Sequence, residues 1–535
     1  MTKIFADKNK LHKLIFWTIF VIGALFRLLL LGKIPAGVHP DEAFAGYEAY
    51  SMLHYGVDSW GYHLPVYFVS WGSGMNVLES YLMMPFVALL GLNEVAIRLP
   101  QVLLAILAMP AMYGLLKEAA DEKLGLIGMG VLAASPWQFM YSRWGCESNL
   151  CPSMLLIASY FLFVAMKRTI NNKAGARKCF VLAAIFFGLD LYCYAATWIL
   201  VAAVILAWAV YFFIFFKKEG RSFDKKLMLS LLIFGLILMA FALPLILFIL
   251  VNLDIIPQLT GLVSIPRLVV FRGDELMDTS VLLGRIHYFA HILVAQEDGR
   301  PWNAIAPYGL FYSKLSIIVI LLGIVYAIRA LVRDIKERKF SAALLLVIYA
   351  SLASILVIIQ RVDIISSNYL QIAIVIFWAV GIYAVFGLNK KWLSAIIGIF
   401  YAFMIVVFLN IYFRYYPAMI NESLPSEARQ VIDDARSLYD EGSVDGIVVT
   451  DKLSHAQVLF YTKYPVYDYM GSASWQEYPS RYLAAKSFGP FSFIGQDEES
   501  YDTSKAYIVG EEEALKLGAM GFSLVQYDNL YLAIY

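Results

Sequence analysis

The sequence predicts a mainly α-helical, polytopic membrane protein with about 11 transmembrane helices, juxtamembrane helices and a small extracytoplasmic α/β domain at the C-terminus. Three observations predict this class. Of the 535 residues, 61% are apolar and only 16% are charged, against roughly 25% charged in ordinary soluble domains. The mean hydropathy is +0.68. After about residue 413, acidic runs replace the long apolar segments. This composition excludes a disordered chain, a disulfide scaffold and a nucleic-acid-binding protein with a basic surface.

Apolar runs of about 20 residues, the length that crosses a bilayer, recur along the first part of the chain. They lie at 12–32, 98–116, 124–141, 151–167, 178–194, 196–216, 227–251, 313–333, 340–360, 366–387 and 392–413. No signal-peptide cleavage site follows the first run, so we expect it to remain as an anchor. A further run at 77–92 has Glu79 near its start and Pro85 in its middle. Whether this run crosses the membrane must be decided from the distribution of charged residues.

The distribution of Lys and Arg decides whether 77–92 crosses the membrane, because cytoplasmic connections carry an excess of these residues. A lysine cluster precedes the first run, which places the N-terminus in the cytoplasm. If 77–92 does not cross, the basic clusters at 167–178, 217–226, 329–339 and 390–391 all face the cytoplasm. If it crosses, all of them face outward. We therefore expect 77–92 to be a juxtamembrane helix on the outer face, and the C-terminus to lie outside.

This topology divides the chain into two predicted parts. Residues 1–413 form the transmembrane domain, with large external loops at 33–97 and 252–312, and residues 414–535 form the external α/β domain. In the latter, the segment 424–442 has helical spacing of its apolar residues. Three segments are predicted to form strands: GIVVT, KAYIVG and LVQYDNLYLAIY.

Adjacent carboxylates follow the first span, in His39-Pro40-Asp41-Glu42. Such a pair can take a proton from a nucleophile, bind a divalent cation or simply be solvated. Pro40 also favours a helix start, where Asp and Glu are preferred in the first turn. Downstream lie aromatic and amide side chains among turn-forming glycines, as a sugar-binding or acceptor-binding surface requires: Trp60, Tyr67, Trp71 and Asn76. The alternative is that these aromatic residues anchor the chain at the lipid headgroups.

The next outer connection adds Glu147, which the topology places on the same side as Asp41. Charged groups at span ends are costly unless paired or hydrated, so a functional use is the default expectation. A pair between Arg143 and Glu147 at helical spacing is the competing structural interpretation. Arginines at span ends suit a phosphate, through two parallel hydrogen bonds, or lipid headgroups. The candidates for the donor phosphate are Arg98, Arg143 and Arg361. The chain has no Walker loop, nucleotide-binding glycine motif or zinc-type Cys/His spacing.

Several motifs in their order resemble the GT-C-fold glycosyltransferases, which include the protein O-mannosyltransferases and the lipid A aminoarabinose transferases. The resemblance is best over about residues 30–200 and is topological beyond. Its motifs are His39-Pro40-Asp41-Glu42, Pro65-Val66-Tyr67-Phe68 through Trp71-Gly72-Ser73-Gly74-Met75-Asn76, Arg98-Leu99-Pro100, Ser135-Pro136 leading to Ser142-Arg143, and Gly188 through Ala196.

The resemblance implies an inverting glycosyltransferase that moves a sugar from a polyprenyl-phosphate donor to a hydroxyl acceptor on the outer face of the cytoplasmic membrane. Asp41 then matches the catalytic base, Glu42 its acidic neighbour beside His39, and Arg98 a residue for the donor phosphate. Glu147 approximates a further acid of the family, but it follows Arg143 by four positions, whereas the mannosyltransferase pattern has Asp at five. The chain also lacks the large inserted external domain of the mannosyltransferases.

The expected partners are membrane lipids, the lipid-linked sugar donor and an acceptor that is a polymer, a lipid or a protein, with no nucleic acid. A divalent metal ion held by Asp41 and Glu147 is the one cofactor that the acidic residues allow. The alternative function is a transporter or flippase of lipid-linked saccharides. Transporters often show repeated halves with broken helices at the middle of the membrane. This chain shows no internal repeat, and its acidic residues lie at the expected outer interface.

Overall fold

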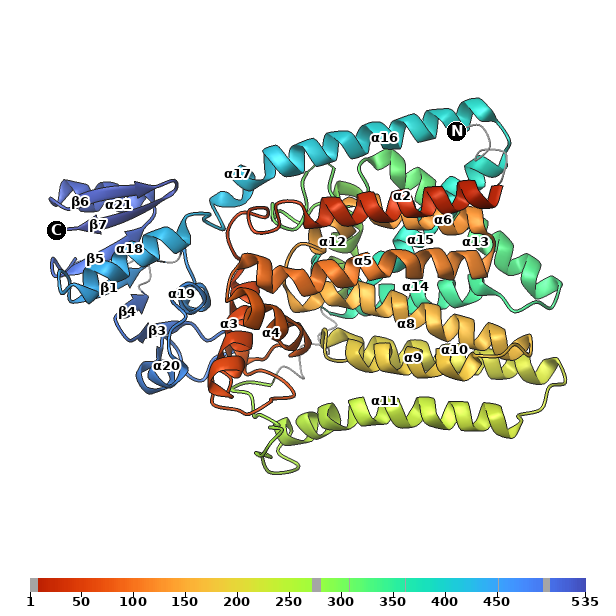
Figure 1. Cartoon of the computed structure of the whole chain (residues 1–535), viewed down its shortest axis with the longest axis horizontal. Helices are drawn as coiled ribbons and strands as arrows, with labels where there is room; N and C mark the ends of the chain where they lie inside the picture. Colours follow the sequence, from red (N-terminus) through yellow and green to blue (C-terminus); the bar gives the residue numbers. More distant parts are fainter. Residues whose placement is uncertain (1–7, 272–280, 307, 361, 451, 494–500) are drawn as a thin grey trace.

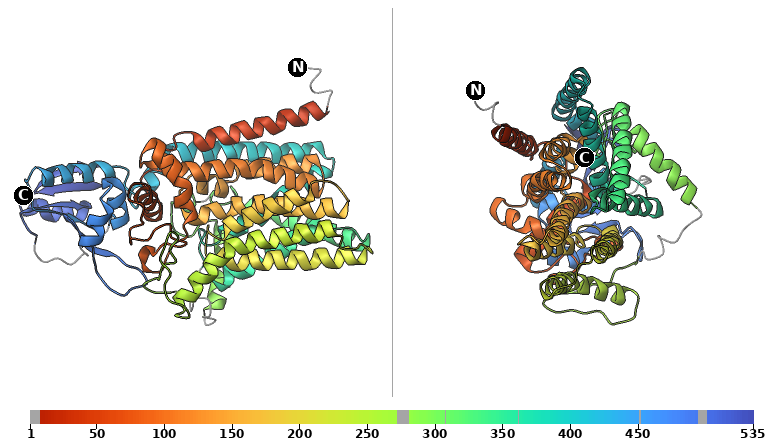
Figure 2. Two further views of the ribbon diagram at one scale, coloured as in Figure 1. Left: turned by 60° about the horizontal axis from the view of Figure 1, so that its bottom comes forward. Right: turned by 90° about the vertical axis from the view of Figure 1, so that its right-hand side faces the viewer.

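A long helical bundle carries a small sheet domain at one end (Figure 1). The computed structural model describes residues 8–271, 281–306, 308–360, 362–450, 452–493 and 501–535. The bundle contains α2 (Lys8–Leu28), α5 (Glu94–Ala119), α6 (Glu122–Ala134), α7 (Pro136–Tyr141), α8 (Glu147–Ile170), α9 (Ala176–Asp190), α10 (Ala196–Lys218), α11 (Lys225–Asn252), α13 (Lys314–Lys336), α14 (Ala342–Ile359), α15 (Gln371–Gly387) and α16 (Lys391–Arg414). These helices run along one common axis (Figure 2).

Nine helices of the described residues are long and apolar enough to cross a membrane. The fold class predicted from the sequence is therefore confirmed, and the chain is a multi-pass membrane protein. The two remaining predicted spans form shorter helices within the bundle. α6 stops after 13 residues because Pro136 follows, and Ser135 caps the short α7 that continues it. α9 has 15 residues and packs between α8 and α11.

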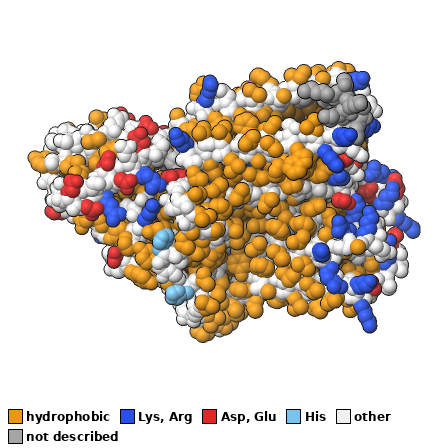
Figure 3. Space-filling model, viewed as in Figure 1, with side chains coloured by type: hydrophobic (Ala, Val, Ile, Leu, Met, Phe, Trp, Pro, Cys, Tyr) orange, Lys and Arg blue, Asp and Glu red, His pale blue; other side chains and the backbone are white. Residues whose placement is uncertain are grey.

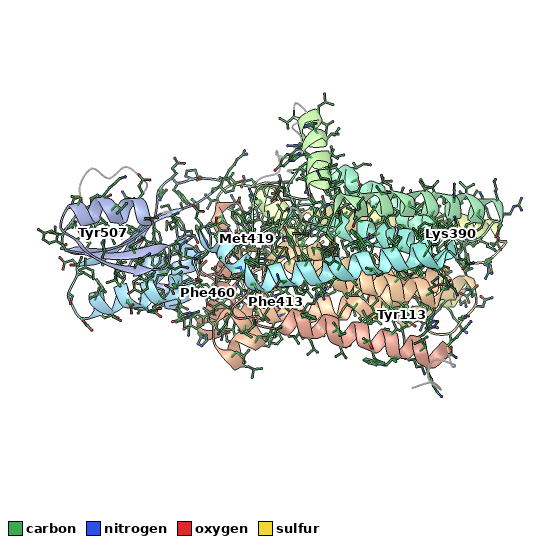
Figure 4. All side chains as sticks on the ribbon, turned by 90° about the horizontal axis from the view of Figure 1, so that it is seen from above. Tyr113, Lys390, Phe413, Met419, Phe460 and Tyr507 are labelled. Atoms are coloured by element: carbon green, nitrogen blue, oxygen red, sulfur yellow. The ribbon has the colours of Figure 1, made fainter. Side chains whose placement is uncertain are left out.

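The doubtful run at 77–92 forms α4 (Leu78–Leu90), which packs against α5 and α3 (Pro40–Tyr55). Figure 1 places α3 and α4 at the end of the bundle that carries the sheet domain. At 13 residues α4 is about 20 Å long, which is shorter than the apolar thickness of a bilayer. Its position agrees with the juxtamembrane helix that the charge distribution predicts. A second short apolar helix, α12 (Leu282–Ala295), lies across the bundle axis (Figure 4).

Figure 3 shows a broad apolar surface over the visible face of the bundle, with Lys and Arg gathered at the end opposite the sheet domain. This is the surface that a lipid bilayer requires, because exposed apolar side chains are stable only in contact with acyl chains. The chain starts at the basic end, and the C-terminus lies in the sheet domain at the other end. Lys390 marks the basic end in Figure 4.

The C-terminal domain follows α17 (Tyr416–Asn421) and consists of a seven-stranded mixed sheet with four helices. The strand order is β2-β3-β4-β1-β5-β7-β6, and β1 is parallel to both β4 and β5. The elements are α18 (Ala428–Asp440), β1 (Gly446–Val449), α19 (His455–Thr462), α20 (Val466–Ser472), β2 (Ser474–Trp475), β3 (Ala485–Phe488), β4 (Phe491–Phe493), β5 (Lys505–Val509), α21 (Glu511–Ala519), β6 (Ser523–Tyr527) and β7 (Leu530–Ile534). The three segments predicted as strands form β1, β5 and the β6–β7 hairpin.

Alternation along the strands divides the domain core into two layers, since successive strand residues face opposite sides. Ile447 of β1 packs in the cluster that contains α18, whereas its neighbour Val448 packs in the cluster that contains α21. The α18 cluster also includes Ala43, Phe44 and Tyr47 of α3. The sheet domain and α3 therefore share one hydrophobic core.

Candidate active site

The N-terminus of α3 carries the acidic pair. His39 caps the helix, because its Nδ1 accepts the backbone N–H of Asp41 at 3.2 Å. In return, the carboxylate of Glu42 accepts the backbone N–H of His39 at 3.4 Å, which completes a capping box. Pro40 supplies the fixed φ of a first helical residue. Both carboxylates thus lie in the first turn, where the helix dipole favours negative charge.

Glu42 is fully buried and neutralised by Arg98 of α5. The two side chains form a bidentate pair, with Nε to Oε1 at 2.8 Å and Nη2 to Oε2 at 3.0 Å. The backbone N–H of Gly145 also donates to Oε1 at 2.9 Å. Glu42 therefore connects three segments of the chain, and its carboxylate is not available to take a proton.

Arg98 uses the rest of its guanidinium on the backbone before α3. It donates to the carbonyl oxygens of Leu31, Pro35 and Gly37 at 3.2, 2.9 and 2.7 Å. Together with the two bonds to Glu42, these occupy all five N–H groups of the guanidinium. The predicted role of Arg98 at the donor phosphate does not fit this geometry, because no donor is left for a phosphate oxygen.

Arg143 makes a similar set of contacts, also fully buried. Its five N–H groups reach the hydroxyl of Tyr412 at 3.1 Å and the carbonyl oxygens of Phe26, Arg27, Leu29 and Ile34 at 2.9, 2.6, 2.7 and 2.7 Å. As for Arg98, no donor of Arg143 is left for a phosphate oxygen in this geometry, and the structure shows no ion pair between Arg143 and Glu147. Both arginines instead fix the connection between α2 and Asp41. Arg361 lies outside the described residues.

Asp41 differs from its neighbours because 40% of its side chain is exposed. Its Oδ1 accepts the indole N–H of Trp71 at 3.1 Å. Its Oδ2 lies 3.7 Å from Nδ1 of His39, but this nitrogen already accepts the N–H of Asp41. Nδ1 of His39 therefore serves as the acceptor of the helix cap. One oxygen of Asp41 is held by Trp71, and 40% of the side chain remains exposed.

Glu147 begins α8 and joins the same cluster. Its Oε2 accepts the backbone N–H of Asn76, and its carboxylate interacts electrostatically with Asp41. The neighbouring thiol of Cys146 lies among the acidic groups as well. Burial raises the pKa of that thiol well above its usual range, and the charges of Glu42 and Asp41 raise it further. The structure thus brings Asp41, Glu42 and Glu147 together at one end of the bundle.

A fourth carboxylate, Glu79 of α4, joins this cluster and was not predicted as a site residue. It is 1% exposed, and neither of its oxygens has a hydrogen-bond partner among the described residues. Burial, followed by the charges of Glu42 and Glu147, raises the pKa of Glu79 well above its usual range. Both the burial and the neighbouring charges therefore favour the protonated form of Glu79. The sequence did offer a signal for Glu79, because an acidic residue within an apolar run is energetically costly and therefore indicates a functional role.

The predicted sugar-binding aromatic residues differ in how much of each ring is covered by other side chains. Tyr67 is buried, with its ring 5.7 Å from that of Trp198 and 4.5 Å from that of Phe248. A packed ring offers no face to a sugar, so this prediction is not supported for Tyr67. Trp60 stacks on Trp475 of the C-terminal domain at 5.6 Å, which covers one of its faces.

The donor set for a metal is incomplete in the described part of the chain, where no three His, Cys, Asp or Glu side chains are grouped to hold an ion. Of the two predicted ligands, Asp41 is held by Trp71 and Glu147 by Asn76. The third acid, Glu42, is already neutralised by Arg98. The described residues therefore do not form the predicted metal site.

Comparison with known proteins supports the interpretation of the fold. Residues 77–247, less than half of the chain, match the sequence profile of the dolichyl-phosphate-mannose-protein mannosyltransferase family. No protein of curated function matches the chain in sequence.

Among solved structures, the chain is similar to ArnT from Cupriavidus metallidurans in the apo state, with 12% identity, a TM-score of 0.53 and coverage of 96% of this chain and 97% of ArnT. The same protein bound to undecaprenyl phosphate gives a TM-score of 0.52 at the same identity and coverage. The oligosaccharyltransferase AglB from Archaeoglobus fulgidus, in complex with an inhibitory peptide and a dolichol-phosphate, gives 15% identity and a TM-score of 0.48 over 83% of this chain. The chain spans 63% of the length of AglB. The resemblance predicted from the motifs is confirmed at the level of the fold, which is the GT-C fold of ArnT.

Proposed function

We propose that this chain is an inverting glycosyltransferase that moves a sugar from a polyprenyl-phosphate donor to a hydroxyl acceptor on the outer face of the cytoplasmic membrane. The observation that carries the proposal is the state of the acidic cluster. Asp41 is partly exposed, whereas Glu42 is neutralised by Arg98, Glu79 is buried with a raised pKa, and Glu147 is held by the backbone N–H of Asn76. Of these four acids we assign Asp41 as the base.

The chemistry needs one such base. Asp41 takes the proton of the acceptor hydroxyl as its oxygen attacks the anomeric carbon of the sugar. The bond between that carbon and the phosphate oxygen breaks, and its electron pair leaves with the polyprenyl phosphate. A single displacement from the opposite face inverts the anomeric configuration. Positioned general bases contribute about 10²–10⁴-fold to such rates.

The membrane setting supports a lipid-linked donor. α3 and α4, which carry Asp41, Glu42 and Glu79, lie at the end of the bundle next to the sheet domain (Figure 1). The excess of Lys and Arg at the basic end favours a cytoplasmic position for that end. It supports the proposal that Asp41 and residues 414–535 lie outside. ArnT, which shares the fold, has been solved with undecaprenyl phosphate bound. Residues 414–535 then act as an extracytoplasmic domain above the outer end of the bundle.

The test is transfer by purified protein in liposomes. Polyprenyl-phosphate donors carrying different radiolabelled sugars are offered with an extract of cell-envelope acceptors, and the anomeric configuration of the product is read by NMR. The proposal expects transfer of label with inversion. Retention of configuration would remove the single-displacement mechanism. Movement of labelled donor across the bilayer without any transfer would identify the alternative, a flippase.

A further inference from the structure

Trp71 connects Asp41 to the C-terminal domain. The indole N–H donates to Asp41 Oδ1 at 3.1 Å. An indole N–H can only donate, and a bond to a carboxylate is stronger than one between neutral groups. This bond fixes the orientation of a carboxylate whose side chain is 40% exposed. Trp71 was predicted as a sugar-binding residue, and its contact with Asp41 gives it a different function.

The backbone at Trp71 is held in an unfavourable conformation. Its φ of 50° and ψ of 17° lie in the left-handed region, and Gly72 follows with φ +79°. Bulky residues persist in this region only where the surrounding structure holds them. Here the C-terminal domain does so, since the N–H of Leu483 donates to the carbonyl of Trp71 at 3.0 Å. A Cβ on Gly72 would lie 2.6 Å from the carbonyl oxygen of Ser480, so the two backbones touch.

His455, the first residue of α19, packs directly on the Trp71 ring. The ring centroids are 5.0 Å apart at an interplanar angle of 69°, an edge-to-face contact. The imidazole is also flanked by Trp475 and Phe493 of the same domain. Burial lowers the pKa of His455 to about 4, so the ring is neutral at physiological pH. It therefore acts as a packing surface for the indole and not as a charge.

The same turn of α19 holds the chain on the other side of Asp41. Gln457 donates from Nε2 to the carbonyl oxygen of Val38 at 2.7 Å, and it is itself fixed by a capping box with Ser454. Further along α19, Phe460 lies close against Gly46 of α3. Figure 4 shows Phe460 at the junction of the two domains. Both segments that determine the position of Asp41 thus rest on α19.

From these contacts we infer that the C-terminal domain is a structural part of the active site, in which His455 holds Trp71 and Trp71 orients the carboxylate of Asp41. Trp71 and His455 are positioning residues. The catalytic part of this inference rests on the proposed function, whereas the physical coupling from His455 through Trp71 to Asp41 does not. Two experiments separate these parts.

The first experiment needs no activity. The protein is labelled with 5-fluorotryptophan, and the fluorine signal of Trp71 is identified by its loss in Trp71→Phe. The signal should shift in Asp41→Ala, which removes the hydrogen-bond acceptor, and in His455→Ala, which removes the packing surface. It should stay in place in His291→Ala, a control on α12. An unmoved signal in either of the first two variants would overturn the coupling.

The second experiment measures transfer kinetics. Trp71→Phe keeps an aromatic face but loses the N–H, so kcat should fall about ten- to a hundredfold with KM unchanged. His455→Ala should lower kcat in the same way, and His455→Phe, which restores an aromatic contact, should recover most of it. Trp392→Phe, on the exposed face of α16, is the matched control.

A raised KM with unchanged kcat in Trp71→Phe would show that Trp71 binds substrate, and the positioning role would be wrong. If the wild type shows no transfer while the fluorine signal still couples Asp41 to His455, the proposed function fails and the coupling stands. If transfer occurs and the signal does not move, the proposed function stands and the coupling fails.

Discussion

The pairing of Arg98 with Glu42 gives a sharp test of the interpretation that the arginine is structural. In Arg98→Met, a side chain of similar length remains but all five hydrogen bonds are lost, and Glu42 stays buried with no counter-charge. Removing one partner of a buried pair costs about 3–5 kcal/mol, mostly from the uncompensated charge left behind. The double variant Arg98→Met/Glu42→Met removes both charges and should recover a large part of that loss.

The assay is thermal unfolding in detergent, followed with a fluorogenic thiol dye. All four cysteines are free and buried, so their reaction with the dye reports loss of structure. Arg333→Met is the control, because 65% of the Arg333 side chain is exposed at the basic end. Its melting temperature should stay near that of the wild type. If Arg98→Met unfolds like the wild type and instead raises KM for the donor, the arginine binds the phosphate after all.

Three further predictions concern pH, packing and orientation. Burial raises the pKa of Asp58 to about 7. The folded state therefore keeps its full stability below about pH 4 and loses stability as the pH rises through 7, where the buried carboxyl must give up its proton. Asp58→Asn should therefore melt above the wild type at about pH 8 but not at about pH 4, and equal shifts at both would contradict this. Gly37 has φ +67°, and a Cβ added to it would lie 2.3 Å from the carbonyl oxygen of Leu424. Gly442 has φ +74°, and a Cβ added there would meet open space. Gly37→Ala should thus lower the melting temperature more than Gly442→Ala, which carries only the left-handed strain of about 1–2 kcal/mol. A reporter fused after Tyr535 should be active only outside the cytoplasm, and cytoplasmic activity would show an even number of spans.

Hydropathy and charge predicted much of this fold because both act locally. Each apolar run became helical, although the run at 124–141 is divided into α6 and α7. The positive-inside rule predicted that α4 lies at one end of the bundle, although its composition is as apolar as that of a span. The number of predicted spans between Asp41 and Glu147 put both residues on the same side of the membrane, and so predicted that they lie near each other. One helix and four strands of the C-terminal domain (β1, β5, β6 and β7) were visible in the spacing of apolar residues.

The roles of the arginines could not be predicted in the same way. An arginine at a span end has the same sequence context whether it binds a phosphate or backbone carbonyls. Only the folded chain shows that Arg98 and Arg143 hold the connection between α2 and α3. The contact of His455 with Trp71 was also hidden, because the two residues are far apart in the sequence and His455 belongs to none of the recognised motifs.

The central claim is that Asp41 takes the proton of the acceptor. Asp41→Asn keeps an oxygen that accepts the Trp71 N–H and removes the basic carboxylate. Asp468→Asn is the matched control, since Asp468 also lies in the first turn of a helix, α20, and is exposed. The most direct measurement is the rate of sugar transfer by the two purified variants, with the melting temperature recorded for each. We predict a fall of about 10²–10⁴-fold for Asp41→Asn at an unchanged melting temperature, and a rate near that of the wild type for Asp468→Asn. Transfer by Asp41→Asn at the rate of the wild type would contradict the assignment of the base.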